Sequence, residues 1–141
     1  MYKNLLIAID LNNLASAKYV VDTCLQLTAN EVNPVYRVVT IIEPVDDSFI
    51  SAFLPKNFDK SVMEEACKAL HAFTEASFPA GAKVQHIVAH GTIYEEINRI
   101  AEEKKVDLIV MLASSKPNAL GLSTNTVKVA RFSDKPVLVL R

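Results

Sequence analysis

Residues 107–112 read Asp-Leu-Ile-Val-Met-Leu, an apolar run that follows one acidic residue. The run is far too short to span a bilayer, which needs roughly 20 apolar residues. It also lacks the alternation of polar and apolar residues that a strand with one wet face would have, so it is typical of a parallel strand covered on both faces. Strand-like runs occur at four further places, in residues 4–9, 35–42, 83–89 and 136–140. The chain is therefore predicted to form a five-stranded sheet.

Helical patterns separate these strands. Apolar residues recur at helical spacing in four stretches, within residues 14–28, 62–73, 93–101 and 125–132. The third stretch follows Thr92-Ile93-Tyr94-Glu95, the sequence of a capping box, which marks a helix start. The alternation of strands and helices predicts a doubly wound α/β fold with right-handed crossovers. Ligands of such sheets bind beyond the carboxyl ends of the strands, which directs attention to Asp10 and to residues 40–43 and 112–115.

Glycine is scarce in this chain. Only 3 of the 141 residues are glycine, Gly81, Gly91 and Gly121, whereas an average usage of roughly 7% would give about 10. Dinucleotide-binding turns and GxxxxGK phosphate loops need clustered glycines, because the backbone must approach phosphate with no Cβ in the way. Both motifs are absent.

The remaining composition is that of one globular domain, expected to span residues 1–141. Fifteen basic residues against 16 acidic ones give a net charge of −1, and no basic patch stands out. This balance argues against nucleic acid as the main partner. Residues 1–9 resemble a signal peptide only faintly, because Asp10 interrupts the apolar stretch and no cleavage site follows. We expect a cytoplasmic protein with no membrane partner.

The sequence places no catalytic group. There is no GxSxG motif, and His71, His86 and His90 form neither HExxH nor a close metal pair, so we expect neither an enzyme nor a metal site. His71 is predicted near the polar face of the second helix, and the other two histidines on one face of the third strand. Cys24 and Cys67 fit no CxxC or disulfide pattern and are predicted to be buried thiols.

Asp10 is the sharpest single candidate for function. It directly follows the apolar residues 5–9, so its carboxylate is expected at the carboxyl edge of a central strand. There it could accept hydrogen bonds from a base, a ribose or a metal-bound ligand. The alternative is a purely structural Asx turn that leads into the first helix, helped by Asn12 and Asn13.

Residues 43–60 form an unusually long connection without a clear helical pattern, and long connections of this kind are often functional. They carry five large apolar residues, Phe49, Ile50, Phe53, Leu54 and Phe58. One interpretation is a lid or a partner-binding segment. The other is that these side chains cover the edge of the sheet, with a short helix at 48–54.

Three segments together resemble the universal stress protein family. They are residues 1–10, Met-Tyr-Lys-Asn-Leu-Leu-Ile-Ala-Ile-Asp, residues 107–111, and residues 133–141, Ser-Asp-Lys-Pro-Val-Leu-Val-Leu-Arg. The resemblance implies a flavodoxin-like sheet of the adenine nucleotide alpha hydrolase-like type, with strand order 3-2-1-4-5 and helices on both faces. It also implies a homodimer in which Pro136–Arg141 pairs with the same strand of a second copy, hiding an apolar edge.

Many members of that family bind ATP through Gly-x₂-Gly-x₉-Gly-Ser/Thr after strand four, and others lack the motif and bind no nucleotide. Counted forward from Asp107, the glycine positions of this chain hold Leu112, Ser115 and Asn125. Counted backward from Lys135-Pro136, the last pair falls on Ser123-Thr124. The backward count is preferred, because a surface loop tolerates deletion better than a packed helix does.

Two functions follow as hypotheses. In the first, an adenine nucleotide such as ATP binds with little or no turnover. The resemblance then assigns the adenine to Asp10 and Ile41, and the phosphates to Ser114, Ser115, Ser123 and Thr124. Ala113 is small enough for close approach, and Asn125 offers an amide at the helix start. In the second, the protein binds no nucleotide and acts through protein partners, using residues 43–60. A small transferase of related fold has the least support.

Overall fold

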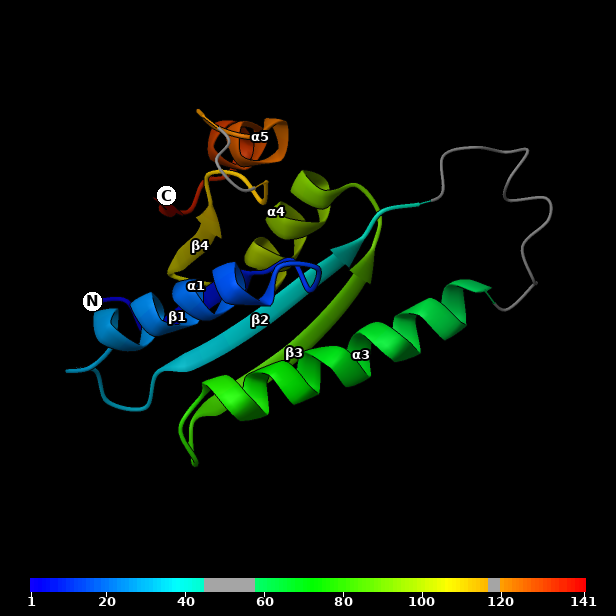
Figure 1. The fold of residues 1–141 in the computed structure, drawn as a ribbon. Coiled ribbons are helices and arrows are strands. Elements are labelled where there is room, and N and C mark those ends of the chain that lie inside the picture. The colour runs from blue at the N-terminus through cyan, green and yellow to red at the C-terminus, as the bar shows by residue number, and fades with distance from the viewer. Residues whose placement is uncertain (45–57, 117–119) are drawn as a thin grey trace.

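The computed structural model describes residues 1–44, 58–116 and 120–141. Its five strands form one parallel sheet in the order β3-β2-β1-β4-β5, which confirms the predicted fold class and strand order (Figure 1). The strands are β1 (Asn4–Ala8), β2 (Val35–Ile42), β3 (Lys83–His90), β4 (Leu108–Leu112) and β5 (Val137–Leu140). Each predicted strand is present, with ends that differ by no more than one residue.

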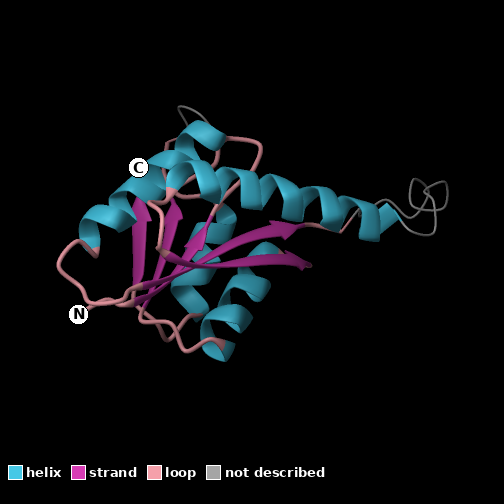
Figure 2. Cartoon of the chain, turned by 90° about the horizontal axis from the view of Figure 1, so that it is seen from below, coloured by secondary structure: helices cyan, strands magenta, loops and turns pink. Residues whose placement is uncertain are grey.

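Helices cover both faces of the sheet, as Figure 2 shows. Helices α1 (Leu14–Leu27) and α3 (Phe58–Ser77) pack on one face, and α4 (Ile93–Glu103) and α5 (Thr124–Phe132) pack on the other. Successive residues of a strand point to opposite faces. Ile7 of β1 therefore packs with Val20 and Val21 of α1, while its neighbour Leu6 packs with Ile97 of α4. Both faces are buried, which explains why the central strands are continuously apolar.

The parallel register brings the carboxyl ends of the strands to one edge. Ile7 of β1 lies opposite Val38 of β2 and Val110 of β4, and the backbone N–H of Ile9 donates to the carbonyl of Val39. The segments that follow β1 and β4 therefore leave the sheet side by side. This is the edge at which the sequence predicts a ligand.

Two helix predictions need correction. Helix α3 begins at Phe58, although the apolar periodicity starts only at Val62, so residues 58–60 are helical rather than part of a connection. The rest of that connection, residues 45–57, lies outside the described residues, as does the predicted helix at 48–54. Thr92 is the N-cap of α4, but its side chain makes no capping hydrogen bond, so the predicted capping box does not form.

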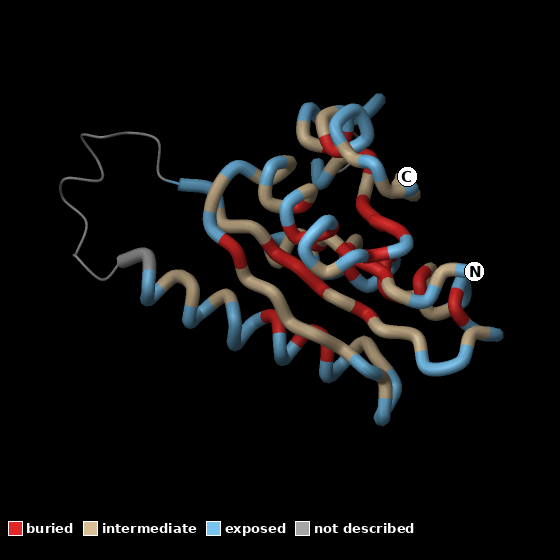
Figure 3. The backbone as a smooth tube through the Cα atoms, turned by 180° about the vertical axis from the view of Figure 1, so that it is seen from behind, coloured by how far each residue is buried: buried red, intermediate tan, exposed pale blue. Residues whose placement is uncertain are grey.

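The cysteine prediction is half right. Cys24 is fully buried in α1, whereas Cys67 is exposed on α3. Cys67 lies between Ala66 and Lys68 on the first half of α3, where the helix turns most of its surface to solvent (Figure 3). In the parts of the chain that the structure describes, no helix is long and apolar enough to cross a membrane.

Candidate functional site

Asp10 lies at the end of β1 and forms the Asx turn that the sequence offered as one interpretation. Its Oδ1 accepts from the backbone N–H of Asn12 at 2.9 Å, and its carbonyl accepts from the N–H of Asn13 at 3.0 Å. Within the described residues no group donates to its second carboxylate oxygen, Oδ2. The turn therefore uses half of the carboxylate, and the other half remains an acceptor for a ligand.

Asn13 connects this turn to the segment after β4. Its Oδ1 accepts from the backbone N–H of Ser16, which caps α1, and its Nδ2 donates to the carbonyl of Ser115 at 3.3 Å. Sequence reasoning considered Asn13 only as part of the turn, because the Ser115 contact spans 102 residues of chain and leaves no local signal. The contact brings the Asp10 turn and the Ser114–Ser115 segment together.

Ser123 anchors the start of α5 to the end of β4. Its hydroxyl accepts from the backbone N–H of Thr126 at 3.1 Å, as an N-cap does, and its own N–H donates to the carbonyl of Ala113 at 2.7 Å. The hydroxyl of Thr126 is buried and donates to the carbonyl of Leu112 at 2.9 Å. Thr126 is a second residue that sequence reasoning missed. These bonds place Ser123 and Ala113 next to each other.

The first turn of α5 carries the other two predicted residues, Thr124 and Asn125. Within the described residues no partner accepts from their backbone N–H groups. Unpaired N–H groups and the helix dipole make the start of a helix favourable for an anion. Ser114 lies on the facing segment, where its hydroxyl accepts from the N–H of Lys116 at 3.2 Å and keeps its own proton for another acceptor.

Ile41 lies near the carboxyl end of β2, opposite Ala89 of β3, and packs partly buried against the α4 and α5 side of the core. Asp10 follows β1, which is the strand next to β2. The predicted residues thus come from the ends of three adjacent strands, β2, β1 and β4, and from the first turn of α5. They share one edge of the sheet.

The backbone at this edge differs from a glycine-rich phosphate loop. Leu112, Ala113 and Ser115 each carry a Cβ, which keeps the backbone between β4 and α5 farther from a phosphate than glycine would. Gly121 is the exception, because its φ of +78° is a conformation that glycine favours and no atom lies within 4 Å of the position a Cβ would take. From the sequence alone, Gly121 was counted among the three glycines but was assigned no role.

Few of the groups at this edge are charged. Asp10 contributes a carboxylate and Lys116 a cation, and the other groups are hydroxyls, amides and backbone N–H groups. Among the described residues no group of three or more histidine, cysteine, aspartate or glutamate side chains could hold a metal ion. The set matches an anionic ligand with hydroxyl groups of its own.

The sequence profile of the universal stress protein family matches residues 1–141. The chain therefore belongs to the universal stress protein family. Universal stress protein MJ0577 of Methanocaldococcus jannaschii is 36% identical to it over 80 residues, which are 55% of this chain and 49% of MJ0577. That alignment spans about half the length of this curated relative.

Solved structures support the same assignment. A structure of MJ0577 has a TM-score of 0.83 with this chain at 26% identity, and the match covers 99% of this chain and 96% of that one. A universal stress protein crystallised in complex with cAMP has a TM-score of 0.62 at 20% identity, covering 99% of this chain and 97% of the other. At 20% identity, the similarity to the cAMP complex is evidence for a shared fold only.

Proposed function

We propose that this universal stress protein binds an adenine nucleotide at the carboxyl ends of β1 and β4, with little or no turnover. The observation that carries the proposal is the hydrogen bond from Asn13 Nδ2 to the carbonyl of Ser115. Because of it, the carboxylate of Asp10 and the hydroxyl of Ser114 belong to one edge rather than to two separate loops.

The phosphate end of the ligand is assigned to the start of α5. This helix has nine residues, and its first backbone N–H groups, at Thr124 and Asn125, have no acceptor among the described residues. The dipole of the helix adds partial positive charge at the same place. Ser114 and Lys116 lie on the segment after β4, which the bond from the N–H of Ser123 to the carbonyl of Ala113 holds beside this helix start. A phosphate there could receive hydroxyl, amide and cationic donors.

The nucleoside end is assigned to Asp10 and Ile41. A ribose offers two hydroxyl donors, and Asp10 Oδ2 is an acceptor that no described residue uses. Ile41 supplies a partly buried apolar side chain at the end of the neighbouring strand, a surface on which a flat base can lie. The relative crystallised with cAMP adds support, since cAMP is itself an adenine nucleotide.

The absence of glycines from the loop after β4 determines the nucleotide affinity that we expect. Where glycine would let backbone N–H groups touch phosphate, this chain has Leu112, Ala113 and Ser115, so more of the phosphate contact must come from side chains and from the helix start. We therefore expect weaker binding than a glycine-rich loop gives, and a marked dependence on Ser114 and Ser123.

Native mass spectrometry of the purified protein, followed by calorimetric titration with ATP, tests the proposal. We expect a saturable signal with ATP. Asp10→Ala should weaken binding about tenfold or more, the cost of losing one charge-assisted hydrogen bond. Asn12→Ala is the matched control, because the side chain of Asn12 makes no hydrogen bond within the described residues.

The absence of both co-purified nucleotide and heat at millimolar ATP would reject nucleotide binding. The alternative, action through protein partners by way of residues 43–60, would then take its place. An equal loss of affinity in Asp10→Ala and Asn12→Ala would reject the assignment of the ribose to Asp10. Release of phosphate from ATP faster than in buffer would instead contradict the absence of turnover, and with it the expectation of a non-enzymatic protein.

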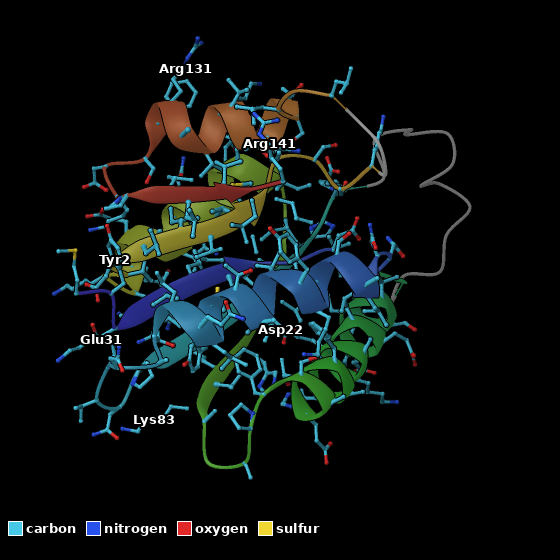
Figure 4. The ribbon with its side chains drawn as sticks, turned by 60° about the vertical axis from the view of Figure 1, so that its left-hand side comes forward. Tyr2, Asp22, Glu31, Lys83, Arg131 and Arg141 are labelled. Atoms are coloured by element: carbon cyan, nitrogen blue, oxygen red, sulfur yellow. The ribbon has the colours of Figure 1, made fainter. Side chains whose placement is uncertain are left out.

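We also propose that the protein is a homodimer that pairs through residues Pro136–Arg141 and is located in the cytoplasm. Strand β5 is an edge strand with β4 on one side, and all four of its residues are apolar and only half-buried. Figure 4 shows β5 at the outer side of the sheet, with Arg141 at its end. An unpaired apolar edge is a template for another strand, and a second copy would cover it.

A further inference from the structure

The rings of His71 and His86 stack on each other between α3 and β3. Their centroids are 3.6 Å apart and their planes differ by 24°. His86 is on the face of β3 that meets α3, and its Nε2 lies 2.6 Å from the hydroxyl oxygen of Thr74, which is buried on α3. Two of the three histidines in the chain thus meet at one contact, although 15 positions separate them.

The hydrogen bonds of Thr74 define which nitrogen of His86 can take a proton. The Thr74 hydroxyl donates to the backbone carbonyl of His71 at 3.1 Å, so its single proton is used. Its oxygen is therefore the acceptor, and the Nε2–H of His86 is the donor. Nδ1 is then the nitrogen left to accept a proton, and the bond to Thr74 survives protonation.

We propose that His71 and His86 form a pH-sensitive latch, which holds α3 on β3 while the pair carries no more than one charge and loosens α3 when both rings are protonated. His71 is exposed on α3 and His86 is half-buried on β3. Two imidazolium rings in face-to-face contact repel each other, so a charged His71 ring is expected to turn out to solvent. The stacking contact that stabilises the packing of α3 at neutral pH is then lost in acid.

The groups around the pair do not offset this repulsion. Within the described residues no carboxylate forms an ion pair with either ring. Opposite His86, β2 contributes Val38, with Tyr36 and Thr40 on the same face, all without charge. The charged or titratable groups one turn before and after His71 on α3 are Cys67, Lys68 and Glu75. Strand β3 adds His90, and α1 adds Lys18, which lines the groove between α1 and α3. Lys68 is paired with Glu65, and Lys18 with Asp22.

Few side chains of α3 are buried, so the packing of this helix is sensitive to the loss of one contact. Among the described side chains of this 20-residue helix, only Leu70, Phe73 and Thr74 are buried, and all three lie beside His71. Figure 3 shows that the buried part of α3 is confined to its second half. The first half has few apolar contacts of its own, so the helix depends on the region that the latch controls.

Loosening α3 would also change a groove of about 490 Å³ between α3 and α1. Phe73, the residue before Thr74, lines this groove together with Ala69 of α3 and Leu14 of α1. Movement of α3 away from the sheet would widen the groove and expose the ring of Phe73. Leu11, the residue after Asp10, also lines this groove, so acid would change a surface beside the Asp10 turn.

The pH range in which the latch should open follows from the direction in which the pKa of His86 is shifted. Burial, and then the charge of His71, lower the pKa of His86 below its ordinary value of 6.5 in the folded state. The unfolded chain therefore binds more protons than the folded one as the pH falls below about 6.5. The stability from the neutral ring is complete above that value and is lost as the pH falls through the folded pKa.

Hydrogen exchange of the full chain at about pH 7.5 and about pH 5, corrected for the intrinsic effect of pH on exchange, tests the latch. We expect amide protection in α3 to fall severalfold in acid, because protonation of His86 is less favourable in the folded chain than in the unfolded one. Protection in α4 should stay within about twofold. His71→Phe keeps a stacked ring that cannot be charged, so it should reduce the acid effect to the part that the burial of His86 causes, while His90→Gln should leave the effect intact.

An NMR titration of the three histidine rings gives a second measurement that needs no variant. A latch predicts that the pKa of His86 lies below its ordinary value, because burial and the charge of His71 both lower it. Unchanged protection of α3 in acid, an equal acid effect in the wild type and His71→Phe, or an unshifted pKa of His86 would each overturn the proposal.

Discussion

The side chain of Asn13 donates to the carbonyl of Ser115 and at the same time accepts from the backbone N–H of Ser16. One side chain therefore caps α1 and fixes the segment after β4 to the start of that helix. The same amide group therefore serves both a local contact within the helix start and a contact with a loop far away in the sequence. Stability and ligand binding should consequently respond together when this group is removed.

The substitution Asn13→Ala tests that coupling. Loss of a helix N-cap costs about 1 kcal/mol of unfolding free energy, within a range of roughly 0.5–2 kcal/mol. We expect a loss of this size in urea unfolding and a nucleotide affinity that is several-fold weaker, because the Ser114–Ser115 segment is no longer tied to the Asp10 turn. Asn12→Ala should change neither quantity. Equal effects of the two substitutions would contradict the role given to Asn13.

The two cysteines should react at very different rates. Burial raises the pKa of the Cys24 thiol to about 12, so at pH 8 only about one thiol in 10⁴ is the reactive thiolate, and reagent cannot reach it. Cys67 is exposed. We expect a thiol-specific reagent to modify one cysteine of the folded protein and two in denaturant, by mass spectrometry. Cys67→Ser should remove the fast reaction, and rapid modification of Cys24 in that variant would contradict its burial.

The sequence predicted the elements well because each strand and helix has a local pattern. Apolar runs located all five strands. The start of α3 was missed because the apolar periodicity begins only at Val62, four residues after the helix begins. The exposure of Cys67 was missed for a related reason. A position one residue away from an apolar stripe can face solvent, and periodicity alone did not separate Cys67 from Ala66.

The site was only partly predictable. Position at a strand end indicated Asp10 and Ser114, which depends on order along the chain. Ser123 was indicated by the resemblance to the universal stress protein family, through the count back from Lys135-Pro136. The roles of Asn13 and Thr126 depend on which carbonyl groups the fold brings near them, which no short pattern encodes. The stacking of His71 on His86 is of the same kind. Each histidine could be placed on its own helix or strand from the sequence, but the contact between their rings depends on how α3 packs against β3.

A charge on the edge strand should dissociate the proposed dimer. Val139 is half-buried on β5, beside the edge that a second copy would cover. We expect Val139→Asp to give a monomeric mass by light scattering at tens of micromolar, while the wild type gives a dimeric mass. Val32→Asp, at an exposed valine before β2, is the control and should remain dimeric with an unchanged circular dichroism spectrum. A monomeric wild type would rule out the dimer.

Gly91, at the junction of β3 and α4, should tolerate no side chain. Its φ of +151° is rare for residues with a Cβ, and a Cβ built there would lie 2.9 Å from Oε1 and 3.0 Å from Cγ of Glu96. Its N–H also donates to the carbonyl of Ile42, which holds the backbone in place. We expect Gly91→Ala to lower the unfolding free energy by about 1–3 kcal/mol, the usual cost of a strained backbone position.

Two comparisons separate the backbone cost of Gly91→Ala from the contact with Glu96. Gly81→Ala places a Cβ at a φ of +87° with nothing within 4 Å, so it carries the backbone cost alone and should destabilise less. In Gly91→Ala/Glu96→Ala the close contact is absent, and part of the loss should be recovered. Glu96→Ala also removes the ion pair of Glu96 with Arg99, but a surface pair of this kind contributes little to the unfolding free energy, so the recovery can be measured. If the double variant is no more stable than Gly91→Ala, then Glu96 moves aside freely, and the requirement for glycine at position 91 comes from the backbone alone.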